Sequence, residues 1–201
     1  LWLDATNIDG KQNTTLTNGS NVSEWKDLSG NGNNAIQTIS SKQPNYIHQD
    51  NLDFVDFDST FSQVLISPLD INSSSLNRLT VVTVFSIEKT TEVGVWGQDD
   101  GGWDRFLLFN HPQGSGLSNG TGVENMTSLS GMVNQGLMIT QSYYKEDESN
   151  GSYFNLNGNL LTEFTSNNND GFSDFIIGSI NRTDGSWMHH GKIAEILVFD
   201  R

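Results

Sequence analysis

Short blocks of β-branched and aromatic residues, separated by glycine-rich segments, are the feature that most limits the fold of this chain. Apolar residues recur with period two or in short blocks, and no stretch shows the sustained i, i+3, i+4, i+7 spacing of an amphipathic helix. Asn157 and Gly158 lie between two such blocks and predict the two positive φ angles of a type I′ hairpin turn. The pattern therefore predicts an all-β fold with strands near residues 79–85, 93–96, 105–109, 175–177 and 193–199.

The organisation of the chain indicates one domain. Glycine pairs divide the 201 residues into strand-length segments, with no long linker, internal repeat or break in composition. β-Sandwiches commonly reach this length as a single unit. The chain starts with LWL rather than with a methionine or a signal peptide. We expect residues 1–201 to be a single domain excised from a larger protein.

Charge and composition exclude several classes of function. The formal net charge is −14 with a pI near 4.3, and the ten basic residues are scattered, which argues against nucleic acid as a partner. The chain has no cysteine, so neither a disulfide framework nor a thiolate metal site is expected. No apolar run approaches the length needed to cross a bilayer, so membrane insertion is not expected.

The order of landmarks along the chain resembles the laminin G-like jelly rolls of the concanavalin A-like superfamily, especially versions in large bacterial surface proteins. The resemblance begins with residues 1–5 (LWLDA) and continues through residues 25–35 (WKDLSGNGNNA). It resumes at the hairpin of residues 155–158 (NLNG) and ends with IIG at 176–178 and GKIAEILVFDR at 191–201. It covers nearly the whole chain.

The resemblance implies a concanavalin A-like β-sandwich of two antiparallel sheets in which the first and last strands pair. It implies binding sites on the concave face of one sheet and in the loops at one edge. It further implies an extracellular or cell-surface location, as a monomeric domain within a multidomain chain.

Calcium is the metal that the sequence supports best, because hard cations prefer carboxylate, amide and carbonyl oxygens from loops. Residues 7–13 look like a degraded copy of the D-x-D-G-D-G-D loop that relatives carry, with Asn7, Asp9 and Asn13 as candidate ligands. A second oxygen-rich turn offers Asp27 and Asn31. The alternative for this turn is structural, with side chains folding back on the backbone and two glycines in left-handed conformations.

Two loops are candidate ligand-binding surfaces. Residues 98–105 (QDDGGWDR) pack three carboxylates beside a tryptophan, which suits a calcium ion with a stacking surface for a sugar or peptide; the alternative is an acidic exposed turn with the tryptophan buried. Residues 181–190 place apolar and histidine side chains on a long loop, where exposure is costly without a partner. The candidate ligand-binding residues are Asp99, Asp100, Trp103, Asp104, Arg105, Arg182, Asp184, Trp187 and His189, of which Asp99 and Asp100 are also candidate calcium ligands.

Catalysis is not expected from the carboxylate pattern. Glycoside hydrolysis needs two carboxylates flanking one bond, and catalytic members of the superfamily carry an E-x-D-x-x-E type strand. The cluster at residues 146–148 (EDE) is typical of a solvated turn, and Asp53, Asp56 and Asp58 lack the required glutamates. Trp2, Trp25 and Trp96 are expected in the core.

We therefore expect a non-catalytic, calcium-assisted, adhesin- or lectin-like module that recognises a glycan or a short peptide end on a host, a neighbouring cell or a surface. One alternative is a structural spacer domain of a surface protein. The other is a glycoside hydrolase, which requires two carboxylates that face each other across a groove.

Overall fold

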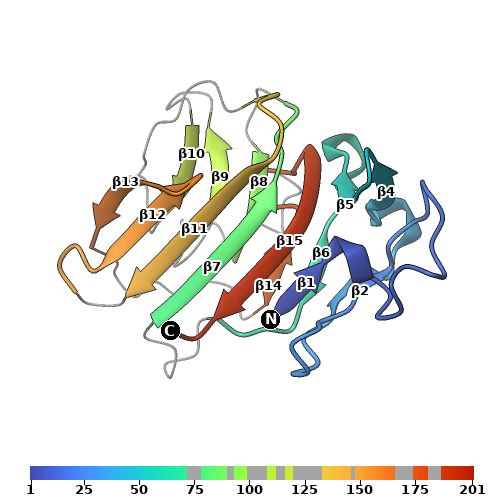
Figure 1. Ribbon diagram of the computed structural model, residues 1–201, viewed down its shortest axis with the longest axis horizontal. Coiled ribbons are helices and arrows are strands. Elements are labelled where there is room, and N and C mark those ends of the chain that lie inside the picture. Colours follow the sequence, from blue (N-terminus) through green and yellow to red (C-terminus); the bar gives the residue numbers. More distant parts are fainter. Residues whose placement is uncertain are drawn as a thin grey trace.

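The chain forms a sandwich of two antiparallel β-sheets, which confirms the predicted all-β fold. This computed structural model describes residues 1–71, 78–89, 93–98, 108–111, 116–119, 133–145, 148–165, 174–180 and 187–201. Figure 1 shows the larger, eight-stranded sheet in front of the smaller, seven-stranded sheet. The larger sheet contains, in spatial order, β13 (Asn159–Phe164), β12 (Ser152–Leu156), β11 (Met138–Lys145), β7 (Arg78–Phe85), β15 (Gly191–Phe199), β5 (Leu52–Phe57) and β4 (Asn45–Gln49), with β1 (Trp2–Asp4) also paired to β15.

The smaller sheet closes the back of the sandwich. Its spatial order is β10 (Gly116–Asn119), β9 (Leu108–His111), β8 (Val93–Gly97), β14 (Phe175–Ile177), β6 (Leu65–Ser67), β3 (Ala35–Ile36) and β2 (Glu24–Trp25). Helical structure is limited to three 3-10 turns in the described residues: η1 (Ala5–Asn7), η2 (Ser40–Lys42) and η3 (Ser59–Phe61). Within the described part of the chain, no helix is both long and apolar enough to cross a membrane.

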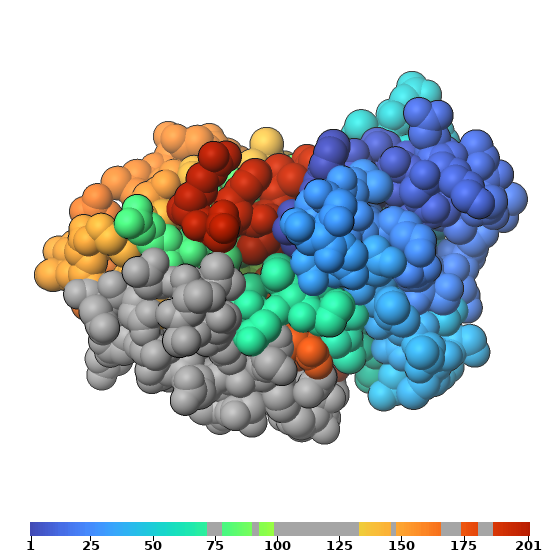
Figure 2. All heavy atoms as spheres, turned by 90° about the horizontal axis from the view of Figure 1, so that it is seen from below, coloured from blue at the N-terminus to red at the C-terminus, as the bar shows by residue number. Residues whose placement is uncertain are grey.

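The first and last strands pair, as the sequence resemblance implies. β1 runs antiparallel to β15, with Trp2 opposite Leu197, and Val198 N–H donates to the Leu1 carbonyl at 2.9 Å. The other edge of β15 pairs with β7, so the last strand lies near the middle of the larger sheet. In Figure 2 the red C-terminal strand accordingly lies against the blue N-terminal segment.

The core lies between the sheets and follows the period-two pattern of the strands. In β7, Leu79, Val81 and Phe85 point inward and are buried, whereas the alternate residues are only half-buried. Trp25 and Trp96 are fully buried, as predicted. The prediction for Trp2 is wrong, because this residue is 40% exposed on the outer face of the larger sheet.

The predicted hairpin and strands are largely confirmed. Asn157 and Gly158 have φ values of 49° and 81°, and they join β12 to β13. The strand predicted at 105–109 agrees with β9 at residues 108–109, and residues 105–107 lie outside the described residues. The strands predicted from sequence did not include β4, β5, β6 or β11, where polar residues alternate with or interrupt the apolar ones.

Candidate functional site

The side chains of the first predicted calcium loop fold back on the loop itself. Asp9 Oδ1 accepts the backbone N–H groups of Lys11 and Asn13, and its Oδ2 accepts the N–H and hydroxyl of Thr15. Asn7 Oδ1 and Asn13 Oδ1 each accept a backbone N–H of the same loop, at 2.6 and 2.7 Å. Burial acts to raise the pKa of Asp9, but these hydrogen bonds outweigh it and lower that pKa to about 2.

The second predicted calcium loop has the geometry of its structural alternative. Asp27 accepts backbone N–H bonds from Trp2, Ser29 and Asn33 at 2.9 to 3.0 Å. Two glycines of the loop have φ values of +85° and +77°. Asn31 is exposed and donates to the Ser29 hydroxyl at 3.0 Å. Asp27 therefore fastens this loop to the start of β1.

The calcium hypothesis stays a prediction. Across the described ranges, no group of three or more His, Cys, Asp or Glu side chains is placed to hold a metal ion. The remaining candidate ligands, Asp99 and Asp100, lie outside those ranges.

Most of the predicted ligand-binding residues lie outside the described residues as well. These are Trp103, Asp104, Arg105, Arg182 and Asp184, together with Asp99 and Asp100. Trp187 is described: it is half-buried with a φ of 56°, and its carbonyl accepts the Gly94 N–H at 2.7 Å. Its backbone therefore joins the loop ahead of β15 to the smaller sheet.

The structure contradicts the prediction that His189 contacts a ligand at the surface. It is fully buried, with its ring 5.8 Å from the ring of Phe57 and 6.4 Å from that of Phe85. Neither ring nitrogen makes a hydrogen bond of good geometry, although the nearby Ser86 backbone favours the protonated ring slightly. Burial and, to a smaller extent, the neighbouring His190 lower its pKa to about 3, and the Ser86 backbone offsets part of this shift. The ring belongs to the core and is shielded from any ligand at the surface, because the turn before β15 directs it between the sheets.

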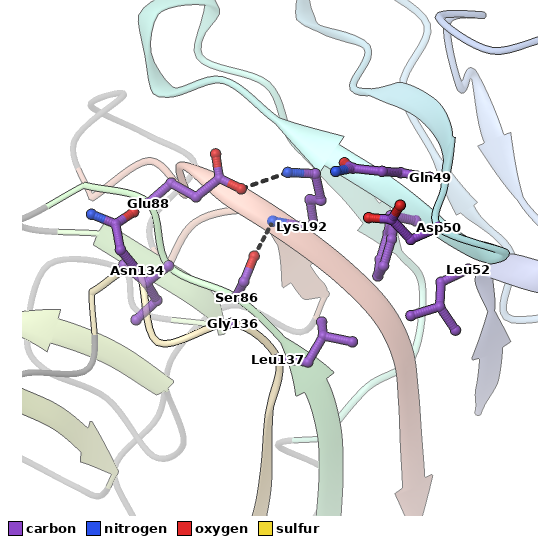
Figure 3. Close-up of a pocket in the computed structure, with 11 residues that line it drawn as sticks. Gln49, Asp50, Leu52, Ser86, Glu88, Asn134, Gly136, Leu137 and Lys192 are labelled. Carbon is purple, nitrogen blue, oxygen red and sulfur yellow. Dashed lines mark hydrogen bonds and ion pairs between the residues drawn. The ribbon is translucent and has the colours of Figure 1, made fainter.

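The structure instead presents a groove on the outer face of the larger sheet. Two hollows of about 300 Å³ each adjoin there and share Leu52, Phe54 and Leu137 in their walls. One continues past Glu88 and Lys192, and Figure 3 shows Lys192 between Glu88 on one side and Gln49 and Asp50 on the other. The other continues over the middle of the sheet to Val84, Ala194, Glu195, Asp4, Thr6 and Asp53. We call this combined feature the outer-face groove.

A charged cluster closes one end of the outer-face groove. Lys192 Nζ contacts Glu88 Oε1 at 2.6 Å, and its backbone N–H donates to the Ser86 hydroxyl at 3.2 Å. Lys192 lies opposite Asp56 in the β15–β5 pairing, which places the two side chains on the same face. His190 Nδ1 lies 3.4 Å from Asp58 Oδ1. Lys192 therefore pairs with Glu88 and lies opposite a second carboxylate, Asp56.

The pKa of the Asp56 side chain is raised in this cluster. Burial raises its pKa, and the attraction of Lys192 and His190 offsets part of that effect. The negative charges of Glu88 and Asp58 raise the pKa further. Asp56 therefore holds its proton to a higher pH than a solvated aspartate does.

Sequence reasoning missed this cluster because its members are far apart in the chain. The carboxylate motifs considered were local, whereas Glu88 and Lys192 are 104 residues apart and meet only because β7 and β15 pair. Predicting how β7, β15 and β5 pair would have brought the members of this cluster together.

The outer-face groove can bind a polar ligand that also has apolar surface. The side chains of Leu52, Phe54 and Leu137 offer contact to the apolar face of a sugar ring, and the surrounding carboxylates accept hydrogen bonds from hydroxyl groups.

Solved structures share this fold. Trypanosoma rangeli sialidase in complex with sialic acid superposes with a TM-score of 0.64 at 13% identity, over 100% of this chain and 30% of the sialidase. Domain 4 of a GH43 extracellular arabinanase from Geobacillus stearothermophilus, in complex with arabinotriose, gives a TM-score of 0.54 at 15% identity, over 77% of this chain and 74% of that domain. No protein-family model and no curated protein sequence matches this chain. The structural likeness at this identity establishes a common β-sandwich fold.

These neighbours correct the expected function. The expectation of a non-catalytic, calcium-assisted adhesin- or lectin-like module is not supported, because the two structures named above come from glycoside hydrolases. Of the functions considered from sequence, the glycoside-hydrolase alternative agrees with them better. The chain spans about a third of the sialidases' length, and a shared fold alone does not decide whether it is itself an enzyme.

Proposed function

We propose that this chain is the substrate-contacting β-sandwich of a glycoside hydrolase, and that the outer-face groove holds part of the glycan. The observation that carries the proposal is the groove itself, with an apolar wall between two groups of hydrogen-bonding side chains. The sialidase and arabinanase structures, which contain sialic acid and arabinotriose, support a carbohydrate ligand. We also propose a concanavalin A-like, laminin G-like class and an extracellular location, both supported by the sequence landmarks.

The position of the outer-face groove suits a long ligand. It opens on the outer face of the larger sheet, and its walls come from strands and turns of that sheet. A chain of sugars can therefore enter and leave the groove without unfolding any strand. Glu88 lines the groove, and Asp56 lies opposite Lys192 on the same face of the sheet, so we propose these two carboxylates as the candidates for hydrolysis.

The proposal is tested by glycan binding and glycan cleavage with the same protein. Isothermal titration calorimetry would measure binding of linear oligosaccharides of arabinose, xylose and glucose and of sialyllactose, and release of reducing sugar would measure cleavage. We expect saturable binding of at least one oligosaccharide, weakened at least tenfold by Glu88→Gln, because this change breaks the ion pair that positions Lys192.

A matched control and a result that would reject the proposal can both be specified. Glu148→Gln makes the same chemical change at an exposed residue paired with Lys145, away from the outer-face groove, and should leave affinity unchanged. Cleavage that disappears in Asp56→Asn would assign the chemistry to this chain. Absence of both binding and cleavage across the panel would reject the proposal in favour of the spacer alternative.

A further inference from the structure

A row of uncharged side chains crosses the outer face of the larger sheet next to the outer-face groove. The strand registers place Asn155 opposite both Leu160 and Gln141, Gln141 opposite Val82, Val82 opposite Leu197, and Leu197 opposite Trp2. Residues directly opposite one another in an antiparallel sheet share a face, so the six side chains form one continuous row. We call it the uncharged row: Leu160, Asn155, Gln141, Val82, Leu197 and Trp2.

Aromatic groups lie toward both ends of the uncharged row. Tyr143 and Tyr153 are stacked beside it, with ring centroids 4.9 Å apart, and Gln141 Nε2 donates to the Tyr153 hydroxyl at 3.1 Å. At the other end, Trp2 Nε1 donates to Glu195 Oε1 at 3.1 Å, which orients the exposed indole. Aromatic rings that are fixed by hydrogen bonds offer preformed stacking surfaces at low entropic cost.

Exposed apolar surface is concentrated on the same face. Among the described residues, eight large hydrophobic side chains are exposed, and five of them lie on the outer face of the larger sheet: Trp2, Leu52, Leu137, Ile139 and Leu160. An apolar patch rimmed by polar groups marks a binding surface. Figure 1 shows the outer faces of β12, β11 and β7 open toward the viewer.

The charges closest to the uncharged row are negative. None of its six side chains ionises, and the flanking rows carry Glu163 on β13, Glu195 on β15 and Asp4 on β1. The basic residues Lys145 and Arg78 face each other one row farther out, beyond Tyr143. The chain carries a formal net charge of −14. An anionic sugar such as a sialic acid or a uronic acid would meet repulsion here, and an uncharged sugar would not.

We propose that the uncharged row binds an extended, uncharged oligosaccharide that runs across the strands and continues into the outer-face groove. Continuity supports a single ligand: Val84, Glu195 and Asp4 in the groove are each two residues along the same strand from Val82, Leu197 and Trp2 in the row. This inference rests on the proposed function and adds to it the length and the charge of the glycan.

The length of the row predicts a dependence on chain length. Its six strands are separated by five strand-to-strand steps, which span about 24 Å at a spacing of about 4.8 Å. A disaccharide is too short to reach from the outer-face groove to Tyr143 and Tyr153, whereas a hexasaccharide can contact both. Affinity should therefore rise with length until the row is filled.

The test measures affinities for linear, uncharged arabino- and gluco-oligosaccharides from disaccharide to hexasaccharide by calorimetry. We expect the wild-type chain to bind a hexasaccharide at least tenfold more tightly than the disaccharide. Tyr143→Ala and Gln141→Leu should remove that advantage and leave disaccharide affinity unchanged. Phe61→Ala is the matched control, because it removes an exposed aromatic ring from η3, outside the row. Thermal melts check that each variant folds.

The outcomes separate this inference from the proposed function. Equal affinity for disaccharide and hexasaccharide would overturn the uncharged row while leaving the groove as a glycan site. Tighter binding of sialyllactose or oligogalacturonate than of any uncharged sugar would overturn the charge selection. Self-association that Tyr143→Ala abolishes, without any length-dependent affinity, would identify the face as a contact between copies and overturn the inference. Absence of all glycan binding would reject the proposed function itself.

Discussion

Replacing His189 with leucine should flatten the pH dependence of stability. His189 is fully buried without a hydrogen bond of good geometry, and burial, with a smaller effect of His190, lowers its pKa from 6.5 to about 3. The unfolded chain therefore takes up a proton as the pH falls through 6.5, and the folded chain does not. A depressed histidine pKa means that stability is complete above pH 7 and decreases on acidification until the pH approaches 3.

The magnitude follows from linkage. With a pKa of 6.5 in the unfolded state and about 3 in the folded state, acidification from pH 7 to pH 5 should cost about 2 kcal/mol. His189→Leu removes this loss. It also replaces two buried ring nitrogens that make no hydrogen bond of good geometry and lie near the Phe57 and Phe85 rings, so the variant should be at least as stable as the wild type at pH 7.

Urea unfolding followed by tryptophan fluorescence at pH 5, 6, 7 and 8 measures the effect. All other ionisable groups are common to both proteins, so the difference between the two stability curves isolates His189. The curves should run parallel from pH 7 to pH 8 and separate by about 2 kcal/mol at pH 5. If both proteins lose the same stability between pH 7 and pH 5, the folded chain protonates His189 and the reasoning is refuted.

Two further predictions concern the loops and turns that support the sheets. Asp9→Ala should destabilise the chain by about 1 kcal/mol at pH 6 in urea unfolding, a value reduced by the solvent exposure of this loop. Because the pKa of Asp9 is lowered, its contribution is present above pH 4 and lost toward pH 2, so an undiminished difference at pH 2 would contradict this account. Gly178→Ala should cost about 3 kcal/mol, since Gly178 has a φ of +86° and a Cβ there would lie 2.5 Å from the Phe57 ring. Gly158→Ala is the control: it has a φ of +81° but no atom within 4 Å, so it should cost only about 1 kcal/mol, and equal losses in the two variants would show that strain alone matters.

The distinction between loop ligands and loop scaffolding could not be made from residue types. Asp9 and Asp27 have the oxygen-rich neighbours of a calcium ligand, yet their carboxylates accept hydrogen bonds from the backbone of their own or a neighbouring segment. Asparagine, aspartate and glycine serve both purposes because short polar side chains satisfy backbone N–H groups as readily as they bind cations. Whether such a side chain binds a cation or caps the backbone depends on where it points, which only the tertiary structure shows.

His189 shows a related limit. An adjacent pair of histidines on a loop predicted contact with a ligand, but residues 188–190 lead directly into β15 and place this ring in the core. His190 faces the other way and lies beside Asp58. Alternation of side chains along an extended chain explains the opposite fates of the two residues, and the sequence alone did not state which would face inward.

The sequence by itself determined the secondary structure class and the local turns. Period-two apolar blocks specify strands because successive side chains point to opposite faces, and Asn157 and Gly158 specify a tight turn because they tolerate positive φ. These are properties of neighbouring residues, so they can be read without the fold.

Only the tertiary structure decided which distant residues share a surface. The outer-face groove joins Glu88 to Lys192, and the uncharged row joins Leu160 to Trp2, through strand registers that span nearly the whole chain. Register depends on how both sheets bury their apolar faces at once, which is a collective property of the packed sandwich. The candidate site therefore arises from strand pairing and has no local sequence motif.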